Sequence, residues 1–534
     1  MKLKLQQKQV LALSTVVLLS AGVLGCSKEA APEAKPAANA NKVDPSAFPI
    51  VKDKVTLKGF ARKDAQLGDY AQMALWKQVE EKTNIHVDWT TPALQDATEK
   101  VNLAIASGDL PDFFIKGVIP QDDVIKYGSQ GILIPLEKLI DGYAPNLKAL
   151  LAKKPEMKAA ITAPDGHIYA LPRIIDYDLI GIPRFPMLNM TWTTKVGMQV
   201  PKTSDDLYQL LKAFKEKDPN GSGSADEIPY SAHNLDWAMR GLEGMFGLER
   251  NLDYYTNVDS ANKLHIWVTD DKYKQLLQYA HKLYAEGLMD KEIFTQTDQL
   301  YFGKLAANRV GFTPLLTAQN AGKFAKDYKG ITPLKGPDGD QLWNMRQDPN
   351  TGGAKAAITK ANKNPEATMR LLDYFYGDEG ATLLYMGGQE GDTYTKAGDG
   401  TLHYKPEILN SQKGFAVEVG ARTIWPGGME FGYYTEKQLS PMMEGTTRPD
   451  DFKTVKDYIT KNHHSMPLLA KEKQDQINGL RTDIDTYIKE MQAKFIIGDA
   501  SFDTWDKYKD TLKKMGIDKL EAQYQDALNT LVKK

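Results

Sequence analysis

Oxygen-bearing side chains alternate with small residues over one short loop, residues 218–227, of this 534-residue chain. Hard cations such as Ca²⁺ take about six to eight oxygen ligands, and a tight glycine-containing turn can aim several at one point. The loop offers the following oxygen-bearing residues: Asp218, Asn220, Ser222, Ser224, Asp226 and Glu227. The spacing therefore indicates calcium binding, with an ordinary Asn-Gly turn carrying solvated acids as the alternative.

The first half of this loop matches the spacing of an EF-hand calcium loop, with Gly223 at the sharp turn. The second half departs from that pattern. Pro229 stands where an EF-hand carries its closing bidentate glutamate, and a second helix cannot begin directly there. The carboxylates come earlier, at Asp226 and Glu227. The residues alone leave both interpretations open, a metal loop and a solvated turn.

An amphipathic helix is expected just before the loop and would position it. Thr203 or Ser204 can cap its first turn, and two acids follow at its positive end. Apolar residues then recur at steps of three and four: Leu207, Leu210, Leu211 and Phe214. This periodicity predicts one buried stripe, and the helix must end near Pro219.

The helix and loop together resemble a segment of extracellular solute-binding proteins of the family-one, sugar-binding group. Within that group they resemble the LipO-like lipoproteins and the alginate-binding proteins, which carry a calcium loop here. The resemblance implies a structural calcium ion held by the side chains of Asp218, Asn220, Ser222, Asp226 and Glu227 and by the carbonyl of Ser224.

The resemblance covers nearly all of the chain after residue 48. It is carried by runs at residues 101–114, 125–140, 143–147, 163–172, 353–376, 387–391, 502–508 and 512–517. At residues 188–193 the chain departs from the family. Asn189 and Thr191 replace an Arg and an Asp, whereas Trp192 is kept. The role of those two charged residues in relatives is therefore not carried over to this chain.

The N-terminus reads as an export signal, residues 1–25. Three lysines precede an apolar run from Val10 to Leu24, and the run ends at Val23-Leu-Gly-Cys26. This ending resembles a bacterial lipobox, in which the cysteine receives a lipid such as palmitate. Cys26 is the only cysteine, so no disulfide can form within the chain. Residues 26–47 have little apolar content, which predicts a flexible linker between lipid and body.

Length and charge narrow the class of protein. A chain of 534 residues is too long for one core, and 67 basic against 69 acidic side chains give no basic excess for nucleic acid. Removing residues 1–25, with three lysines and no acid, changes the net charge from −2 to −5.

Segments 54–60, 70–82 and 85–90 read as strand, helix and strand, which implies parallel strands.

The resemblance implies an α/β, two-lobed fold of the periplasmic-binding-protein type. Each lobe would be a sheet flanked by helices, with hinge crossovers between the lobes. Residues 48–172 and 353–395 are expected to form the N-terminal lobe, and residues 173–352 and 396–534 the C-terminal lobe.

In a two-lobed binding protein the ligand is expected in the cleft between the lobes. Sugars stack on aromatic rings and form hydrogen bonds with charged or amide side chains, so such residues are the candidates. Eight Trp and 25 Tyr are available. Candidate residues lie near predicted strand ends, crossovers and glycine-rich turns: Phe60, Arg62, Tyr177, Arg184, Trp237, Arg240, Glu390 and Trp425. Each has an alternative role, because tryptophans commonly lie in cores and arginines in surface ion pairs.

Enzyme motifs are absent from the sequence: it has no H-E-x-x-H, P-loop or G-x-S-x-G. The resemblance implies a monomeric, lipid-anchored protein on the extracellular face of the cell membrane. It would capture an oligosaccharide and deliver it to the permease of an ABC importer, without catalysis or nucleic acid. The alternatives are a surface sensor or adhesion lipoprotein and a glycosidase, which needs only two facing carboxylates.

Overall fold

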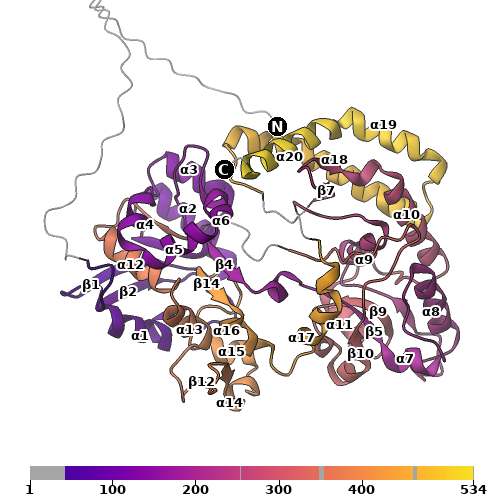
Figure 1. The fold of residues 1–534 in the computed structure, drawn as a ribbon, viewed down its shortest axis with the longest axis horizontal. Coiled ribbons are helices and arrows are strands. Elements are labelled where there is room, and N and C mark those ends of the chain that lie inside the picture. Colours follow the sequence, from indigo (N-terminus) through magenta and orange to yellow (C-terminus); the bar gives the residue numbers. More distant parts are fainter. Residues whose placement is uncertain (1–42, 253, 348–353, 461–465, 533–534) are drawn as a thin grey trace, which may run out of the picture. The chain divides into compact units, whose positions relative to one another are not determined.

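Two four-stranded mixed sheets form the centres of the fold (Figure 1). The first has the strand order β11-β3-β1-β2, in which β1 is parallel to β2 and β3, and β11 is antiparallel to β3. Its strands are β1 (Val55–Phe60), β2 (Ile85–Thr90), β3 (Phe113–Ile119) and β11 (Ala354–Ile358). The predicted parallel opening is confirmed, with helix α1 (Ala74–Thr83) between β1 and β2.

The second sheet has the order β10-β5-β9-β6. Its strands are β5 (Phe185–Asn189), β6 (Ile228–Tyr230), β9 (Val310–Leu315) and β10 (Tyr328–Gly330). Strand β5 is antiparallel to both β9 and β10, whereas β6 is parallel to β9.

The computed structural model describes residues 43–532 apart from 253, 348–353 and 461–465, so Cys26 and the predicted signal lie outside the described residues.

The central strands β3, β5 and β9 are buried on both faces. In β3, Phe113 packs into one apolar cluster and Phe114 into another, and in β5 Met187 and Leu188 do the same. Strands covered on both faces read as continuous apolar runs, as these do. Helices therefore flank each sheet, and the predicted α/β class is confirmed.

The packing extends the N-terminal lobe, which we define by the core around the first sheet. Helices α12 (Pro365–Tyr374) and α13 (Asp378–Met386) contribute to this core. So do apolar residues from Leu402 to Leu439, which the sequence assigned to the C-terminal lobe. In addition, strand β14 (Gly432–Thr435) pairs in parallel with β4 (Arg173–Asp176). We propose that the second boundary lies near residue 440 instead of 396.

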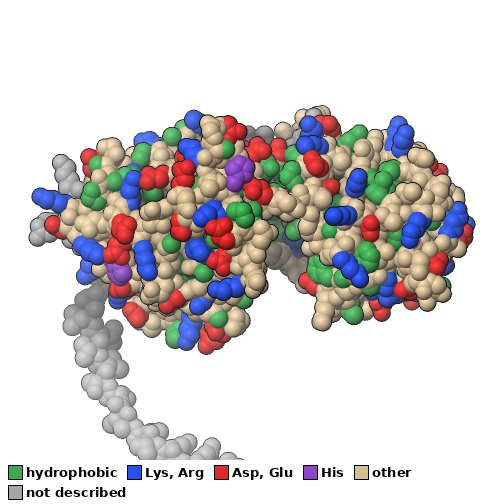
Figure 2. All heavy atoms as spheres, turned by 90° about the horizontal axis from the view of Figure 1, so that it is seen from below, with side chains coloured by type: hydrophobic (Ala, Val, Ile, Leu, Met, Phe, Trp, Pro, Cys, Tyr) green, Lys and Arg blue, Asp and Glu red, His purple; other side chains and the backbone are tan. Residues whose placement is uncertain are grey.

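The C-terminal lobe, defined by the core around the second sheet, includes three helices at the end of the chain. These are α18 (Lys471–Ile497), α19 (Trp505–Met515) and α20 (Ile517–Val532). Their buried apolar residues pack with α10 (Asp271–Ala285) in one core. No helix among the described residues is long and apolar enough to cross a membrane. Figure 2 shows acidic and basic side chains interspersed on the face in view.

Helix α20 is attached to strand β8 (Leu264–Ile266) by a histidine between two carboxylates. His265 contacts Asp270 Oδ1 at 2.7 Å through Nε2 and Glu521 Oε2 at 2.9 Å through Nδ1. Glu521 also accepts a hydrogen bond from the backbone N–H of Ile266. Hydrogen bonds to Asp270 and Glu521 raise the pKa of His265 from 6.5 to about 10.

His265→Gln is expected to destabilise the protein in a pH-dependent manner. Since the folded pKa lies above the unfolded one, the imidazolium contributes its full stabilisation below pH 6.5 and loses it as the pH rises toward about 10. The melting temperature difference between wild type and variant should therefore be largest at pH 6 and shrink by pH 10. Melting curves over this pH range measure it, and a constant difference would contradict the ion-pair assignment.

Candidate functional site

Helix α8 (Ser204–Glu216) leads into the predicted metal loop, as the sequence indicates. Thr203 is the cap: its Oγ1 accepts a hydrogen bond from Asp206 N, and the Asp206 carboxylate accepts one from Thr203 N, both at 3.0 Å. The four apolar residues of the predicted stripe are fully buried. Because the buried stripe packs into the core of the C-terminal lobe, helix α8 fixes the position of residue 218, where the loop begins.

The loop closes on its own oxygen atoms. The Asp218 carboxylate accepts hydrogen bonds from the backbone N–H groups of Ser222 and Gly223, each at 3.0 Å. Asp226 Oδ1 accepts from Asn220 Nδ2 at 2.8 Å and from Ser222 Oγ at 2.9 Å, and these bonds hold the pKa of Asp226 below its usual value. Asp218 itself has a φ of +43°, a left-handed conformation that marks a tight turn.

Glu227 supplies an observation that fits a cation. Its Oε1 is buried and has no hydrogen-bond partner, and burial, together with the Asp218 carboxyl group, raises its pKa. A positive ion would relieve both effects. Nevertheless, within the described part of the chain no three Asp, Glu, His or Cys side chains converge in a ready-made metal cluster. The donor types fit calcium, and a bound ion would replace the present hydrogen bonds of the loop.

Three of the predicted ligand-binding residues lie together in the C-terminal lobe. Helix α9 (Leu235–Glu243) carries Trp237 and Arg240, and Asn234 Oδ1 caps it by accepting a hydrogen bond from Trp237 N at 3.1 Å. The Cζ atoms of Arg184 and Arg240 lie 4.1 and 5.3 Å from the Trp237 ring centre. We call these three side chains the Trp237 cluster.

The Trp237 cluster has unused hydrogen-bond donors. Arg240 Nε donates to Asp236 Oδ2 at 2.9 Å, but Arg240 Nη1 and Arg184 Nε are buried without a partner in the structure. Burial lowers the pKa of Arg184. Buried polar groups are normally hydrogen-bonded, so such donors indicate a place where a ligand or water supplies the acceptors.

Two further predicted residues meet in the N-terminal lobe, at the loop of residues 424–429. The Trp425 ring stacks on Tyr385 with centroids 5.6 Å apart and an interplanar angle of 9°, and Trp425 Nε1 donates to the Tyr385 carbonyl at 3.0 Å. Arg62 Nη2 donates to the carbonyl of Gly427 at 3.2 Å and pairs with Asp64 Oδ1 at 3.3 Å. One face of Trp425 is thus used in packing within the protein.

Lys116 anchors this loop, and sequence reasoning missed it. Its fully buried Nζ donates to the carbonyls of Ile424, Pro426 and Gly428 at 2.7, 3.1 and 2.6 Å. Asp64 Oδ2 lies 3.1 Å away as the counter-charge. The available signal was a single lysine within the apolar run of β3, since a lone buried charge needs dedicated partners.

More buried charges, also missed, lie beside Lys116. Arg173 Nη1 pairs with Glu430 Oε1 at 3.4 Å, and the hydroxyl of Tyr385 donates to the same oxygen at 2.7 Å. Burial, followed by repulsion from Arg173, lowers the pKa of Lys355 from 10.5 to about 8. A nearby anion or an acceptor-rich ligand would favour the charged form of Lys355.

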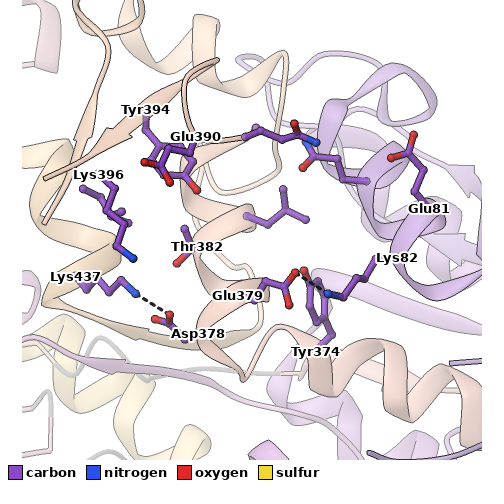
Figure 3. Close-up of a pocket in the computed structure, with 15 residues that line it drawn as sticks. Glu81, Lys82, Tyr374, Asp378, Glu379, Thr382, Glu390, Tyr394, Lys396 and Lys437 are labelled. Carbon is purple, nitrogen blue, oxygen red and sulfur yellow. Dashed lines mark hydrogen bonds and ion pairs between the residues drawn. The ribbon is translucent and has the colours of Figure 1, made fainter. Parts of the chain in front are cut away.

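The remaining predicted residues are dispersed. Phe60 is only 4% exposed and packs on Phe114 in the core, and Tyr177 is half-buried against the N-terminal core. Glu390 is exposed and lines a separate cavity of about 570 Å³ with Tyr394 (Figure 3). Lysine–carboxylate pairs border that cavity, such as Lys437 with Asp378 Oδ2 at 2.6 Å. None of the other seven predicted residues lines it.

The two residues that depart from the family pattern have structural roles. Asn189 is buried and caps helix α7 (Met190–Lys195), because its Oδ1 accepts a hydrogen bond from Trp192 N at 3.0 Å. Thr191 donates through Oγ1 to Asp327 at 2.7 Å. Strand β5 ends at Asn189, and helix α7 begins at the next residue, Met190.

Comparison with known proteins places these features in context. Residues 64–382 match the family model described as bacterial extracellular solute-binding protein. FusA of Streptococcus pneumoniae, a fructooligosaccharide ABC transporter substrate-binding protein, is 31% identical over 494 residues, covering 89% of this chain and 90% of FusA. Lipoprotein LipO of Bacillus subtilis is 24% identical over 473 residues, covering 83% of this chain and 86% of LipO.

Solved structures of solute-binding proteins are also similar to this chain. The FusA complex with kestose has a TM-score of 0.73 at 29% identity, covering 89% of this chain and 99% of that one. A FusA EF-hand mutant with fructo-nystose gives 0.71 at 28% identity, with the same coverage. The alginate-binding protein AlgQ2 without calcium ion gives 0.67 at 26%, covering 90% and 99%. These neighbours are two-lobed, so the predicted two-lobed fold is confirmed.

Proposed function

The chain belongs to the bacterial extracellular solute-binding proteins, and we propose that it captures an oligosaccharide for an ABC importer and releases it unaltered. The family prediction is thereby confirmed. The observation that carries the proposal is the Trp237 cluster, in which an aromatic ring lies beside two arginines whose buried donors lack partners. A sugar fits this set, because it offers C–H faces to a ring and hydroxyl acceptors to guanidinium groups.

Solute capture by this fold would depend on lobe closure. We place the Trp237 cluster on the C-terminal side of the binding site and the Arg62–Trp425 loop on the N-terminal side. A ligand that contacts both sides only in the closed form shifts the population toward that form, which a permease can recognise. The sequence similarity to FusA, a fructooligosaccharide ABC transporter substrate-binding protein, covers 89% of this chain. It supports a neutral oligosaccharide as the first ligand to test.

Lipid anchoring completes the proposal. We propose that Cys26 carries the lipid and that residues 26–47 form the linker, which would hold a monomer on the extracellular face of the cell membrane. The lipobox-like sequence supports this assignment, and so does the name of the relative LipO as a lipoprotein. A sensor or adhesion role on the same body would share the anchor and the binding site but would not require a permease.

Calorimetry with a small sugar panel tests the function. The purified chain, without its signal, would be titrated with kestose, nystose, maltotriose and trigalacturonate, and the sugars recovered for chromatography. Saturable binding of at least one of them with no shortened product is expected. Shortened products would instead support the glycosidase alternative, and no binding to any of the four would contradict the proposal. Loss of labelled-sugar uptake in cells lacking the protein would separate an importer from a sensor.

We also propose that the loop of residues 218–227 holds a structural calcium ion. The ligands would be Asp218, Asn220, Ser222, Ser224, Asp226 and Glu227. The partnerless buried oxygen of Glu227 supports this, and so does the description of a FusA variant as an EF-hand mutant. Bound calcium would add positive charge to a carboxylate-rich turn in which Arg309 Nε already lies 3.3 Å from Asp226 Oδ2, and it would tie the end of α8 to β6.

Chelation is expected to lower the melting temperature of the wild-type protein. An ion present at 100 times its Kd stabilises the folded state by about 2.7 kcal/mol, and EGTA removes that contribution. Asp218→Ala should lower the melting temperature in calcium and abolish the response to EGTA. Differential scanning fluorimetry with and without EGTA measures both effects.

Asp259→Ala is the matched control for this prediction. Asp259 likewise accepts backbone hydrogen bonds within an exposed turn, from Ala261 N at 2.8 Å and Lys263 N at 2.9 Å. Its loss should weaken the turn but leave the EGTA response intact. An EGTA response that is equal in wild type and Asp218→Ala, or absent from the wild type, would remove the calcium proposal.

A further inference from the structure

A cavity of about 610 Å³ lies in the C-terminal lobe, apart from the predicted ligand-binding residues, none of which lines it. Its walls come from residues 200–203 before α8, from the end of β10 and the segment after it (residues 329–333 and Lys335), and from Thr454 of helix α17 (Arg448–Val455). Cavities of roughly 300–1,000 Å³ accommodate small organic ligands. We call this the α8–β10 cavity.

The floor of the α8–β10 cavity is apolar. Pro201, Ile331 and Pro333 are buried beneath it, and Met190 is half-buried at its side. Val200 at the rim is 36% exposed, which makes it one of the few large apolar side chains left open to solvent among the described residues. Covering these surfaces with an apolar group would remove them from water, which is favourable.

The rim of the cavity carries charge of one sign. Lys202, Lys329 and Lys335 line it and are exposed, and no Asp or Glu lines it. Among the described residues none of these lysines forms an ion pair. Two carboxylates lie near the rim without pairing with these lysines: Asp206 accepts from the backbone N–H groups of Lys202 and Thr203, and Asp451 Oδ1 accepts from Gly330 N while its Oδ2 is buried without a hydrogen-bond partner. The rim is therefore a cationic border around an apolar floor.

We propose that the α8–β10 cavity binds a small amphipathic anion, an apolar ring or chain that carries one carboxylate, sulfonate or phosphate. The apolar part would cover the floor, and the anionic group would stay near the lysines at the solvent boundary, where its desolvation cost is small. A sugar fits less well, because no aromatic ring of the described residues lines the cavity for stacking, and the hydroxyls of Thr203 and Thr454 are already hydrogen-bonded within the protein. The site is thus independent of the proposed sugar site.

The fluorescent dye 8-anilinonaphthalene-1-sulfonate tests this proposal directly, because it combines an apolar ring system with one sulfonate. The full chain without its signal should bind the dye at one saturable site with a rise in fluorescence. Octanoate should displace the dye, whereas octanol, with the same chain length and no charge, should displace it poorly. Kestose should not displace it, which keeps the outcome distinct from that of the sugar experiment.

Charge variants locate the dye. Lys329→Gln combined with Lys335→Gln should weaken dye binding by about fivefold, because two partly solvated ion pairs are lost. Lys323→Gln with Lys326→Gln is the control, since these lysines belong to the same lobe and do not line the cavity. Equal dye affinity in both double variants, or equal displacement by octanol and octanoate, would overturn the proposal.

Discussion

Lys116→Met is expected to lower the free energy of unfolding by about 3–5 kcal/mol, the usual cost of removing one partner from a buried ion pair. The ammonium group is fully buried and satisfies three loop carbonyls in addition to Asp64. Methionine fills a similar volume but leaves three buried carbonyls without their donor, and the buried Asp64 carboxylate keeps Arg62 but loses Lys116. Urea unfolding followed by tryptophan fluorescence measures the loss.

Binding should weaken as well, because the anchored loop carries Trp425. Without Lys116 the loop of residues 424–429 loses the group to which three of its carbonyls are bonded, and the Trp425 ring would lose its fixed position. Calorimetry with kestose below the unfolding transition should show weaker binding of a still-folded variant. This second measurement separates a positioning role from stability alone.

Lys77→Met is the control for this prediction. Lys77 lies on α1 in the same lobe, and its side chain is exposed. Surface substitutions of this kind usually change stability by about 0.5 kcal/mol or less. If Lys116→Met is as stable as Lys77→Met, the buried network does not hold the loop, and the N-terminal side of the proposed site must be reassigned.

Local elements were predictable from the sequence because their signals lie within a few residues. Helix α8 shows this, since its cap, its apolar stripe and its proline stop are adjacent in the chain. The same holds for the opening strand, helix and strand, where alternation and helical spacing each indicate one element. Local signals thus predicted helix α8, the parallel opening and the position of the candidate metal loop, whereas the two-lobed fold class followed from the family resemblance.

Long-range placements were not predictable in the same way. Lys116 bonds to carbonyls more than 300 residues later, at Ile424, Pro426 and Gly428, and backbone carbonyls carry no residue-specific signal. The return of residues 402–439 to the N-terminal core depends on similar distant packing. Arg184 and Trp237, by contrast, were both selected from their surroundings, but their stacking across 53 positions appears only in the structure.

Trp237→Ala is expected to weaken oligosaccharide binding by roughly 30-fold to 1,000-fold, corresponding to about 2–4 kcal/mol for an aromatic hot spot. The ring is only partly buried against the two cores of its lobe, and two guanidinium groups rest against it. Its removal takes away both the stacking surface and the support that orients Arg184 and Arg240. Calorimetry with the tightest-binding sugar of the panel measures the change.

Two variants distinguish lost recognition from lost packing. Trp237→Phe keeps an aromatic face for the sugar and the arginines, so its affinity should fall between those of the wild type and Trp237→Ala. Trp505→Phe alters a buried tryptophan on α19, in the same lobe, and should lower the melting temperature without changing affinity. If folded Trp237→Ala binds the sugar as tightly as Trp505→Phe does, the ligand does not stack on Trp237, and the geometric basis of the proposed function fails.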